Sequence, residues 1–378
     1  MSEFTVRAKN FRVLEHLEWS PSGVCLLGGA NGAGKTTTLD ALKFLALLFS
    51  LGQESAFSAS GGDYFGRLGA PPDEPVTFEV EVEGIVWKLR FPMDSGGMKG
   101  GFGEELLRNG APVLTAAMYE QEWSLGKKRF VREEGRSCAR ALWDRGDDRW
   151  MEPLVALLNG LRVYEAYWLN QVRRSESPDL SASFLHGTGR NLWSVLANWK
   201  GAPMRYRGQF AWVMKHAALA FPDLVGSLEF DRGLPYLFRP GATDPSDGLP
   251  PRRAPDGLLT GLLHLTAVAG ARDGAVIAFD ELENQLHPHA IRAILTAMRE
   301  AADERGLTII LTTHSPVVMN EFKGFEDQFF VLDDVGDAPQ PRLLTEVRSE
   351  AWLSHFALGD LYEREAIAPQ TSKRPAGS

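Results

Sequence analysis

The sequence predicts an α/β fold with a mixed central sheet, an antiparallel β subdomain and a helical lobe. Three observations carry this prediction. Apolar strand patterns alternate with helical patterns near both ends of the chain, short alternating segments fill residues 75–144, and residues 151–224 show a helical pattern rich in Trp and Tyr. Because strands that alternate with helices form parallel sheets, we expect such a sheet to form the centre of the fold.

The expected elements can be placed along the chain. Near the N-terminus these are two strands and a helix, at residues 5–11, 23–27 and 36–48. Residues 76–82 and 85–90 alternate apolar and polar side chains, and Gly84 between them allows a tight hairpin. A loop rich in Pro, Gly and Asp follows at residues 239–255, and beyond it helices and strands alternate at residues 258–269, 275–279, 288–302, 307–312 and 328–332.

The composition is that of a compact globular protein. The chain has 378 residues, of which 44% are apolar, and only two cysteines, Cys25 and Cys138. We find no signal-peptide pattern, and the longest apolar run, 41–51, is shorter than the roughly 20 residues that cross a bilayer. We therefore expect a cytoplasmic protein without a membrane partner. Its net charge of −9 means that any DNA contact needs a local basic patch.

A glycine-rich stretch after the second expected strand fits the phosphate-binding P-loop pattern. Gly29, Gly34, Lys35 and Thr36 have the required spacing, and a helix is expected directly after them. Backbone N–H groups of such a loop bind phosphate, the lysine contacts the β and γ oxygens, and the threonine hydroxyl holds Mg²⁺. A glycine-rich turn without function is the alternative. The sequence therefore predicts an ATP site made by Asn31, Gly32, Ala33, Gly34, Lys35, Thr36 and Thr37.

Two adjacent carboxylates end the apolar strand at residues 275–279. Asp280 is expected to bind Mg²⁺, and Glu281 to orient and deprotonate the attacking water. Alone, such a pair would more often be a solvated turn, but its combination with a P-loop favours the functional interpretation. Glu283 is a second candidate for the base, and we rank it below Glu281 because successive side chains at a strand end diverge.

A histidine follows the next apolar strand. His314 stands two residues after the strand at 307–312, where it can hydrogen-bond the γ-phosphate. A single histidine is more often structural, so its place beside the site decides between the two interpretations. The sequence predicts Glu281, His314 and Lys35 as the catalytic residues.

Three blocks together resemble one family of ATPases. They are Asn-Phe-Arg at 10–12 ahead of the P-loop, residues 280–288, and residues 312–316. In combination they look like the RecF-like AAA-family ATPases, which are related to the heads of chromosome-maintenance (SMC) proteins and to the overcoming-lysogenization-defect (OLD) proteins. The resemblance implies an ABC-ATPase-type P-loop head. It also implies a stand-alone ATPase, since the segment after His314 leaves little room for a TOPRIM nuclease domain.

The resemblance divides the chain into domains. Residues 1–150 and 256–365 would form the ATPase lobe with its β subdomain, residues 151–255 the helical lobe, and residues 366–378 a flexible tail. The helical lobe is too short for long coiled-coil arms. It would end in a signature loop that touches the nucleotide of a second copy.

The signature loop departs from the family pattern. Pro255 stands where the family has serine, and proline donates no hydrogen bond, although Gly257 could still bring backbone amides to the nucleotide. Hydrolysis could therefore be weak. Gln171 is a further candidate, for the glutamine that senses Mg²⁺, in a sequence context that matches the family poorly.

The resemblance implies a homo-oligomer, at least an ATP-dependent dimer in which two heads pair head to tail, and a separately encoded effector. Basic clusters that could contact DNA, or that could be solvated faces, lie at Lys127, Lys128, Arg129 and Arg132, at Arg173 and Arg174, at Arg205 and Arg207, and at Arg252 and Arg253.

Three functions fit these features. The first is an ATPase that couples pairing to DNA sensing or effector control in repair or antiphage defence. The second is a slow, ATP-bound scaffold that sequesters or positions a toxin or nuclease, favoured by the acidic net charge and Pro255. The third is the nucleotide-binding subunit of a transporter, which would need a well-formed signature loop.

Overall fold

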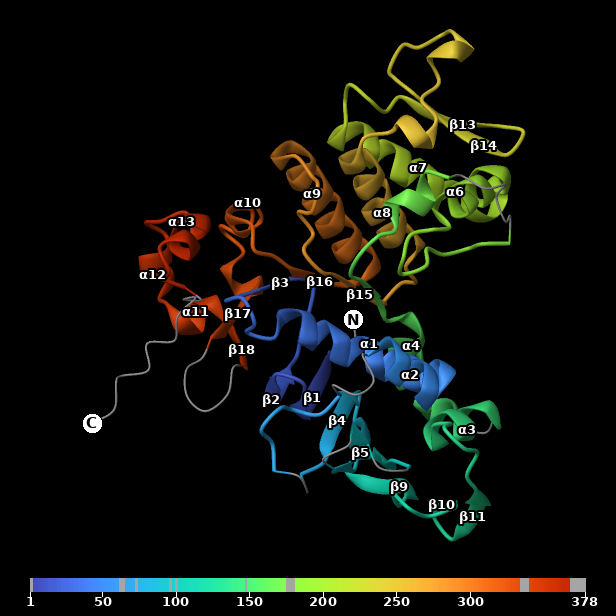
Figure 1. Ribbon diagram of the computed structural model, residues 1–378, viewed down its shortest axis with the longest axis vertical. Coiled ribbons are helices and arrows are strands. Elements are labelled where there is room, and N and C mark those ends of the chain that lie inside the picture. Colours follow the sequence, from blue (N-terminus) through green and yellow to red (C-terminus); the bar gives the residue numbers. More distant parts are fainter. Residues whose placement is uncertain are drawn as a thin grey trace.

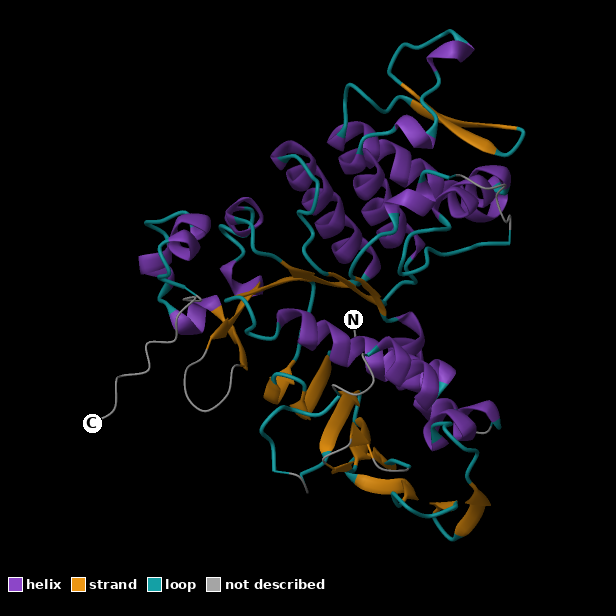
Figure 2. Ribbon diagram, viewed as in Figure 1, coloured by secondary structure: helices purple, strands orange, loops and turns teal. Residues whose placement is uncertain are grey.

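Two sheets and the helices around them build the protein (Figure 1). The computed structural model describes residues 3–60, 65–71, 74–94, 97–98, 101–146, 148–174, 181–333 and 340–367. Figure 2 shows helix α1 (Lys35–Leu51) between the two sheets, whereas α8 (Asp256–Gly270) and α9 (Pro288–Arg305) cover the opposite face of the central sheet. The central sheet therefore has helices on both faces, as a buried parallel sheet requires.

The central sheet is mixed, as the sequence predicts. Its strands lie in the order β12 (Arg162–Tyr164), β15 (Val276–Phe279), β16 (Thr308–Thr312), β3 (Val24–Gly29), β17 (Phe329–Asp333) and β18 (Gln340–Leu343). Neighbouring strands are parallel from β12 to β17, and β18 is antiparallel to β17. The carboxyl ends of β15, β16 and β3 therefore meet at one edge of the sheet, and the segments that leave this edge can build a site.

The second sheet is an antiparallel meander, which confirms the predicted β subdomain. It contains, in spatial order, β11 (Lys128–Val131), β10 (Glu122–Leu125), β9 (Ala111–Ala116), β8 (Gly103–Arg108), β5 (Ile85–Phe91), β4 (Val76–Val82), β1 (Phe4–Phe11) and β2 (Leu14–Trp19). In β4, buried residues alternate with half-buried ones, because one face of the strand packs on the core. The hairpin from β4 to β5 turns at Gly84, whose φ of 72° suits glycine.

The remaining elements are mostly helical. They are α2 (Gln53–Ala59), α3 (Cys138–Asp144), α4 (Glu152–Gly160), α5 (Leu169–Val172), α6 (Leu192–Gly201), α7 (Pro203–Ala220), α10 (Pro316–Asn320), α11 (Leu344–Val347), α12 (Glu350–Leu353) and α13 (Leu358–Glu363), with the hairpins β6 (Met93–Asp94) to β7 (Gly97–Met98) and β13 (Ser227–Asp231) to β14 (Leu234–Phe238). Within the ranges given above, no helix has both the length and the apolar character needed to cross a bilayer.

The structure corrects the sequence-based prediction in three places. Strand β12 lies inside the stretch 151–224 for which only helices are predicted, and its three residues are too few to show a strand period. Strand β2 was not predicted, although it pairs with β1 along its length. Ile367, within the predicted tail of residues 366–378, is buried in the core, so the tail does not begin at 366; residues 368–378 lie outside the described residues.

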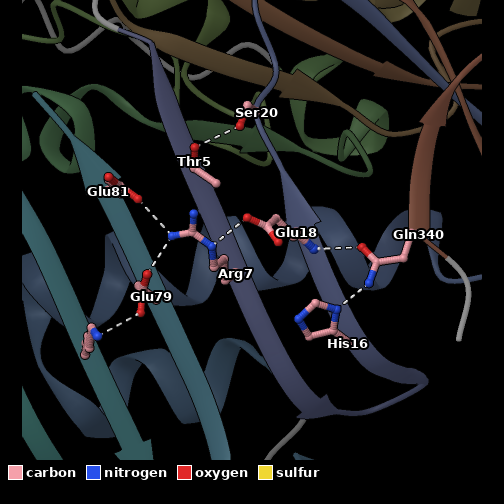
Figure 3. A network of polar contacts seen from close by, with 9 residues as sticks. Thr5, Arg7, His16, Glu18, Ser20, Glu79, Glu81 and Gln340 are labelled. Carbon is pink, nitrogen blue, oxygen red and sulfur yellow. Dashed lines mark hydrogen bonds and ion pairs between the residues drawn. The ribbon is translucent and has the colours of Figure 1, made fainter.

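A polar network lies on the outer face of the antiparallel sheet and joins it to the central sheet (Figure 3). Arg7 on β1 forms ion pairs with three glutamates, Glu18 at 2.8 Å, Glu79 at 2.6 Å and Glu81 at 2.9 Å. Gln340 on β18 accepts a hydrogen bond from the backbone N–H of Glu18 at 3.0 Å. The edge strands of the two sheets are therefore tied together by a side chain.

A buried carboxylate joins the antiparallel sheet to helix α3. Glu104 on β8 is 3% exposed and accepts hydrogen bonds from the Trp87 indole at 2.9 Å and the Ser137 hydroxyl at 2.7 Å. It also accepts the backbone N–H groups of Cys138 at 2.6 Å and Ala139 at 2.8 Å, in the first turn of α3. These four bonds compensate for the burial of the charge.

We predict that Glu104→Ala lowers the free energy of unfolding by about 3 kcal/mol or more, because it leaves buried donors without an acceptor. Denaturant unfolding of the variant and the wild type measures this difference. Glu105→Ala is the matched control: Glu105 is half-buried on the same strand, and we expect a change within about 0.5 kcal/mol. Equal effects of the two substitutions would contradict the assigned role of Glu104.

Candidate nucleotide site

The glycine-rich loop lies between β3 and α1, at the carboxyl edge of the central sheet. Gly34 ends the loop with a φ of 104°, and a Cβ atom there would lie 2.9 Å from Cδ2 of Leu14. Glycine is therefore required both by the backbone conformation and by the close approach of the neighbouring strand. The N-terminus of α1, a helix of 17 residues, follows directly and presents its first N–H groups to the loop.

Lys35 is folded back onto the loop. Its Nζ donates hydrogen bonds to the carbonyl oxygens of Gly29 at 2.9 Å and Ala30 at 3.0 Å, and the residue is 6% exposed. Burial lowers the pKa of Lys35 to about 8, against the opposing effect of nearby carboxylates led by Asp280. A buried ammonium group of this kind gains from an anion, and phosphate oxygens would supply one.

Thr36 and Asp280 come together although they are far apart in the sequence. The Thr36 hydroxyl donates to Oδ2 of Asp280 at 3.0 Å, and the Thr312 hydroxyl donates to Oδ1. A hydroxyl and a carboxylate are the oxygen ligands that Mg²⁺ takes beside nucleotide phosphates and water. The Thr36 hydroxyl and the Asp280 carboxylate therefore fit a Mg²⁺ ion that is shared with phosphates.

The turn after Asp280 carries Glu281 in an unusual backbone conformation. Glu281 has a φ of 49°, in the left-handed region that non-glycine residues seldom adopt. Its N–H donates to the Thr312 hydroxyl at 2.9 Å, and its carboxylate accepts from the Asn284 side chain at 2.9 Å. Such a conformation persists only where the surroundings hold it, and it is frequent at active sites.

Thr312 is a site residue that sequence reasoning missed. It is completely buried, and its hydroxyl contacts both Asp280 and the backbone of Glu281. The available signal was a hydroxyl at the end of an apolar strand. Sequence alone does not show which strands are neighbours.

His314 lies near the loop, and Glu283 holds its backbone. The His314 N–H donates to Oε1 of Glu283 at 2.9 Å, and its Nδ1 lies 3.0 Å from the Tyr362 hydroxyl. Tyr362 also reaches the Gly29 carbonyl at 3.5 Å and was not predicted. Burial lowers the pKa of His314, and the charge of Lys35 lowers it further, so the imidazole is neutral near pH 7. Glu283 and Glu281 each accept one of these hydrogen bonds, from the His314 N–H and from the Asn284 side chain, so their contacts do not separate the two candidates for the base. Glu281 keeps the first rank because it follows Asp280 directly.

Gly257 lies at the start of α8, against the turn that follows Glu281. A Cβ atom at Gly257 would lie 2.5 Å from the Gln285 carbonyl oxygen, so only glycine fits this contact. Arg173 donates to the Asp256 carboxylate and, at 3.2 Å, to the Ala254 carbonyl. The loop around Pro255 is therefore fixed from both sides.

Gln171, predicted as the Mg²⁺-sensing glutamine, lies on α5 with an exposed side chain, and α5 packs against α8. The residue that directly follows β12 at the carboxyl edge is Glu165, whose carboxylate binds Lys43 of α1 at 2.8 Å. No strand is predicted from the sequence in this stretch, and because β12 ends at Tyr164, Gln171 lies seven residues beyond the carboxyl edge of the sheet. We do not carry Gln171 forward as a magnesium residue.

Comparisons with known proteins agree with this geometry. Residues 26–147 and 242–320 match the family described as "AAA domain, putative AbiEii toxin, Type IV TA system". These stretches make up more than half of the chain, and the chain belongs to this family of AAA ATPases. In part of its sequence the chain is similar to RecF, and its fold is similar to that of SMC heads, in line with the resemblance seen in the sequence.

Individual relatives match this chain over a short stretch or at low sequence identity. The "DNA replication and repair protein RecF" of Herpetosiphon aurantiacus is 41% identical over 68 residues, which span 18% of this chain and 18% of that protein. An SMC head bound to the C-winged helix domain of ScpA has a TM-score of 0.52 at 12% identity, over 91% of this chain and 99% of that one. An SMC head with an extended coiled coil, bound to the C-terminal domain of ScpA derived from Pyrococcus furiosus, has a TM-score of 0.50 at 12% identity, over 94% and 99%. At this identity the solved structures show the fold.

We predict that Thr312→Val slows phosphate release from ATP, because both Asp280 and the Glu281 backbone lose a hydroxyl partner. The free energy of unfolding should also fall by about 1–3 kcal/mol, since the Glu281 N–H is left unpaired. Steady-state hydrolysis and denaturant unfolding measure the two effects.

Thr266→Val is the matched control. Thr266 on α8 is also completely buried, and among the described residues its hydroxyl oxygen has no hydrogen-bond partner. Substitution there should leave hydrolysis unchanged. If the two variants hydrolyse ATP equally fast, Thr312 does not organise the site.

Proposed function

We propose that this protein binds ATP with Mg²⁺ and hydrolyses it. The observation that carries the proposal is the 3.0 Å contact between the Thr36 hydroxyl and Asp280, directly beside the buried Lys35. Asn31, Gly32, Ala33, Gly34 and Thr37 complete the loop and first helical turn that would surround the phosphates. When bound, Mg²⁺ would neutralise phosphate charge and orient the β and γ oxygens.

In this proposal the chain's own residues divide the work of hydrolysis. Lys35 exchanges its two loop carbonyls for phosphate oxygens, and Thr36 and Asp280 hold the metal. Glu281 orients the attacking water and takes its proton, because its side chain follows the metal-binding carboxylate on the same turn. In the tautomer whose Nδ1 accepts from the Tyr362 hydroxyl, neutral His314 carries its proton on Nε2 and donates it in a hydrogen bond toward the γ-phosphate.

We further propose that ATP pairs two copies head to tail. The N-terminus of α8 packs by Gly257 against the chain's own turn after Glu281, and α8 and α1 lie on opposite faces of the central sheet (Figure 1). Pro255 and Asp256 beside it are exposed, so the N-terminus of α8 is accessible, and this supports a role for Gly257 at the nucleotide of a second copy. Pro255 supplies no N–H at this position, so the pairing contact rests on the remaining backbone amides and hydrolysis is slow.

We predict that Glu281→Gln stays paired when ATP and Mg²⁺ are present and that its phosphate release falls at least about 100-fold, because the general base is lost while binding is kept. Light scattering gives the mass, and phosphate release gives the turnover. Lys35→Met is the control for binding and should remain unpaired. If ATP changes the mass of neither the wild type nor either variant, the pairing is contradicted. If Glu281→Gln turns over ATP as fast as the wild type, Glu281 is not the base.

We propose that the paired state controls an output in DNA repair or antiphage defence. The match to RecF supports DNA sensing, and the family description, with its toxin-antitoxin system, supports control of a separate effector. In the predicted basic cluster of Arg173 and Arg174, the Arg173 guanidinium already binds the Asp256 carboxylate. Lys127 and Lys128 are exposed on the β10–β11 hairpin and are the better candidates for phosphate contacts. The transporter alternative has less support, since Pro255 departs from the signature loop that it would need.

We predict that double-stranded DNA stimulates hydrolysis by the wild type, and that Lys127→Glu combined with Lys128→Glu removes the stimulation without changing the basal rate. Phosphate release at two salt concentrations, with and without DNA, measures this. The same change in charge at Arg232 and Arg239, which are exposed at the β13–β14 hairpin and lie outside the predicted basic clusters, shows whether the β10–β11 hairpin or the net charge is responsible. A wild type that DNA does not stimulate would favour the alternative, a slow ATP-bound scaffold for an effector protein.

A further inference from the structure

A buried histidine outside the predicted motifs joins three segments next to Glu281. His264 lies on α8, two turns after Gly257, and is 4% exposed. Its Nε2 lies 3.2 Å from the carbonyl oxygen of Leu282, and its Nδ1 lies 3.1 Å from the Tyr167 hydroxyl. Leu282 follows Glu281 directly, and Tyr167 belongs to the segment between β12 and α5.

The direction of these two hydrogen bonds is fixed by chemistry. Burial lowers the pKa of His264 to about 4, so the imidazole is neutral near pH 7 and carries a single N–H. A carbonyl can only accept, so the N–H is on Nε2 and points to Leu282. Nδ1 then accepts from the Tyr167 hydroxyl, which keeps its proton because burial raises the pKa of Tyr167. Each hydrogen bond therefore has one direction: Tyr167 donates to His264, and His264 donates to Leu282.

The Leu282 peptide is part of the turn that sets the backbone of Glu281. Its N–H donates to the Thr312 carbonyl at 3.3 Å, so this residue is held on both its N–H and its C=O. Glu281 itself adopts the left-handed conformation, which the neighbouring contacts must maintain. Loss of the bond at Leu282 would let the turn relax and shift the Glu281 carboxylate.

Helix α8 contacts the same turn at a second place and also packs on the strand before it. Gly257 leaves no room for a side chain against the Gln285 carbonyl, and the His264 ring packs edge-on against Phe279 with centroids 4.9 Å apart. A displacement of α8 would therefore move the turn at both ends. The helix that begins at the signature-like loop and the turn that carries Glu281 behave as one packed unit.

We propose that His264 is a positioning residue for hydrolysis: it transmits the placement of α8 and of the Tyr167 segment to the turn that holds Glu281. This inference rests on the proposed role of Glu281 as the base. His264 touches neither nucleotide nor water in this scheme. It acts on the rate through the geometry of Glu281 and leaves the P-loop, which binds the nucleotide, unchanged.

The test separates kcat from KM in a set of variants. His264→Leu should lower kcat about 10- to 100-fold, the size of effect expected from a misplaced catalytic group, with KM for ATP within about threefold of the wild type. His264→Gln offers an amide donor for Leu282 and a carbonyl acceptor for Tyr167, and should recover most of the rate. Tyr167→Phe removes the hydroxyl that donates to Nδ1 of His264 and should give a smaller loss of kcat.

His216→Leu is the matched control, because His216 on α7 is 2% exposed and its ring lies against Trp212 on the same helix, with Nε2 3.6 Å from Glu300 on α9. It should change kcat by less than about twofold. If His264→Leu fails to fold, the other two variants test the proposal. A near-wild-type rate in His264→Gln together with a reduced kcat in Tyr167→Phe supports it. Wild-type kcat in Tyr167→Phe, or equal losses in His264→Leu and His216→Leu, overturns it.

The same experiment distinguishes failure of this inference from failure of the proposed function. If the wild type and Glu281→Gln hydrolyse ATP equally, Glu281 is not the base and the positioning role falls with it. If Glu281→Gln is inactive while His264→Leu keeps its kcat, the proposed function stands and the role of His264 is wrong.

Discussion

Asp280 lies between two threonine hydroxyls, and the candidate site depends on this arrangement. Thr36 lies in the first turn of the helix after β3 and Thr312 ends β16, so the carboxylate joins three neighbouring parallel strands at their carboxyl ends. The parallel order β15, β16, β3 brings the acid-bearing turn and the P-loop to one edge although 244 positions separate Thr36 from Asp280. Burial of these strands on both faces keeps their ends in fixed positions.

Helices on both faces of the central sheet contact this site. On one face, α1 carries the P-loop threonine and packs toward the antiparallel sheet; on the other, α8 packs against the turn after Glu281 through Gly257 and His264. A contact made by a second copy at the start of α8 would therefore reach the catalytic turn through packed side chains. Coupling between pairing and hydrolysis needs no movement of the sheet itself.

Local patterns explain what the sequence could predict. The P-loop, the strand that ends at Asp280 and the antiparallel hairpin are each encoded within about ten residues, and the structure has them where they were expected. Thr312, Tyr362 and His264 act through contacts between distant segments, which no local period reveals. The strand that ends ahead of Gln171 was not predicted, because the three residues of β12 are too few to show a strand period. The functional roles of the predicted site residues stay predictions.

The central claim is that Thr36 and Asp280 hold Mg²⁺ against ATP, and ATP affinity with and without the metal tests it most directly. Titration calorimetry with a non-hydrolysable ATP analogue, in Mg²⁺ and then in EDTA, should show binding by the wild type that is stronger with Mg²⁺ by about tenfold or more. Asp280→Asn, which keeps the shape of the side chain, should lose this gain and keep the affinity measured in EDTA. A gain from Mg²⁺ that is equal in Asp280→Asn and the wild type would contradict the claim.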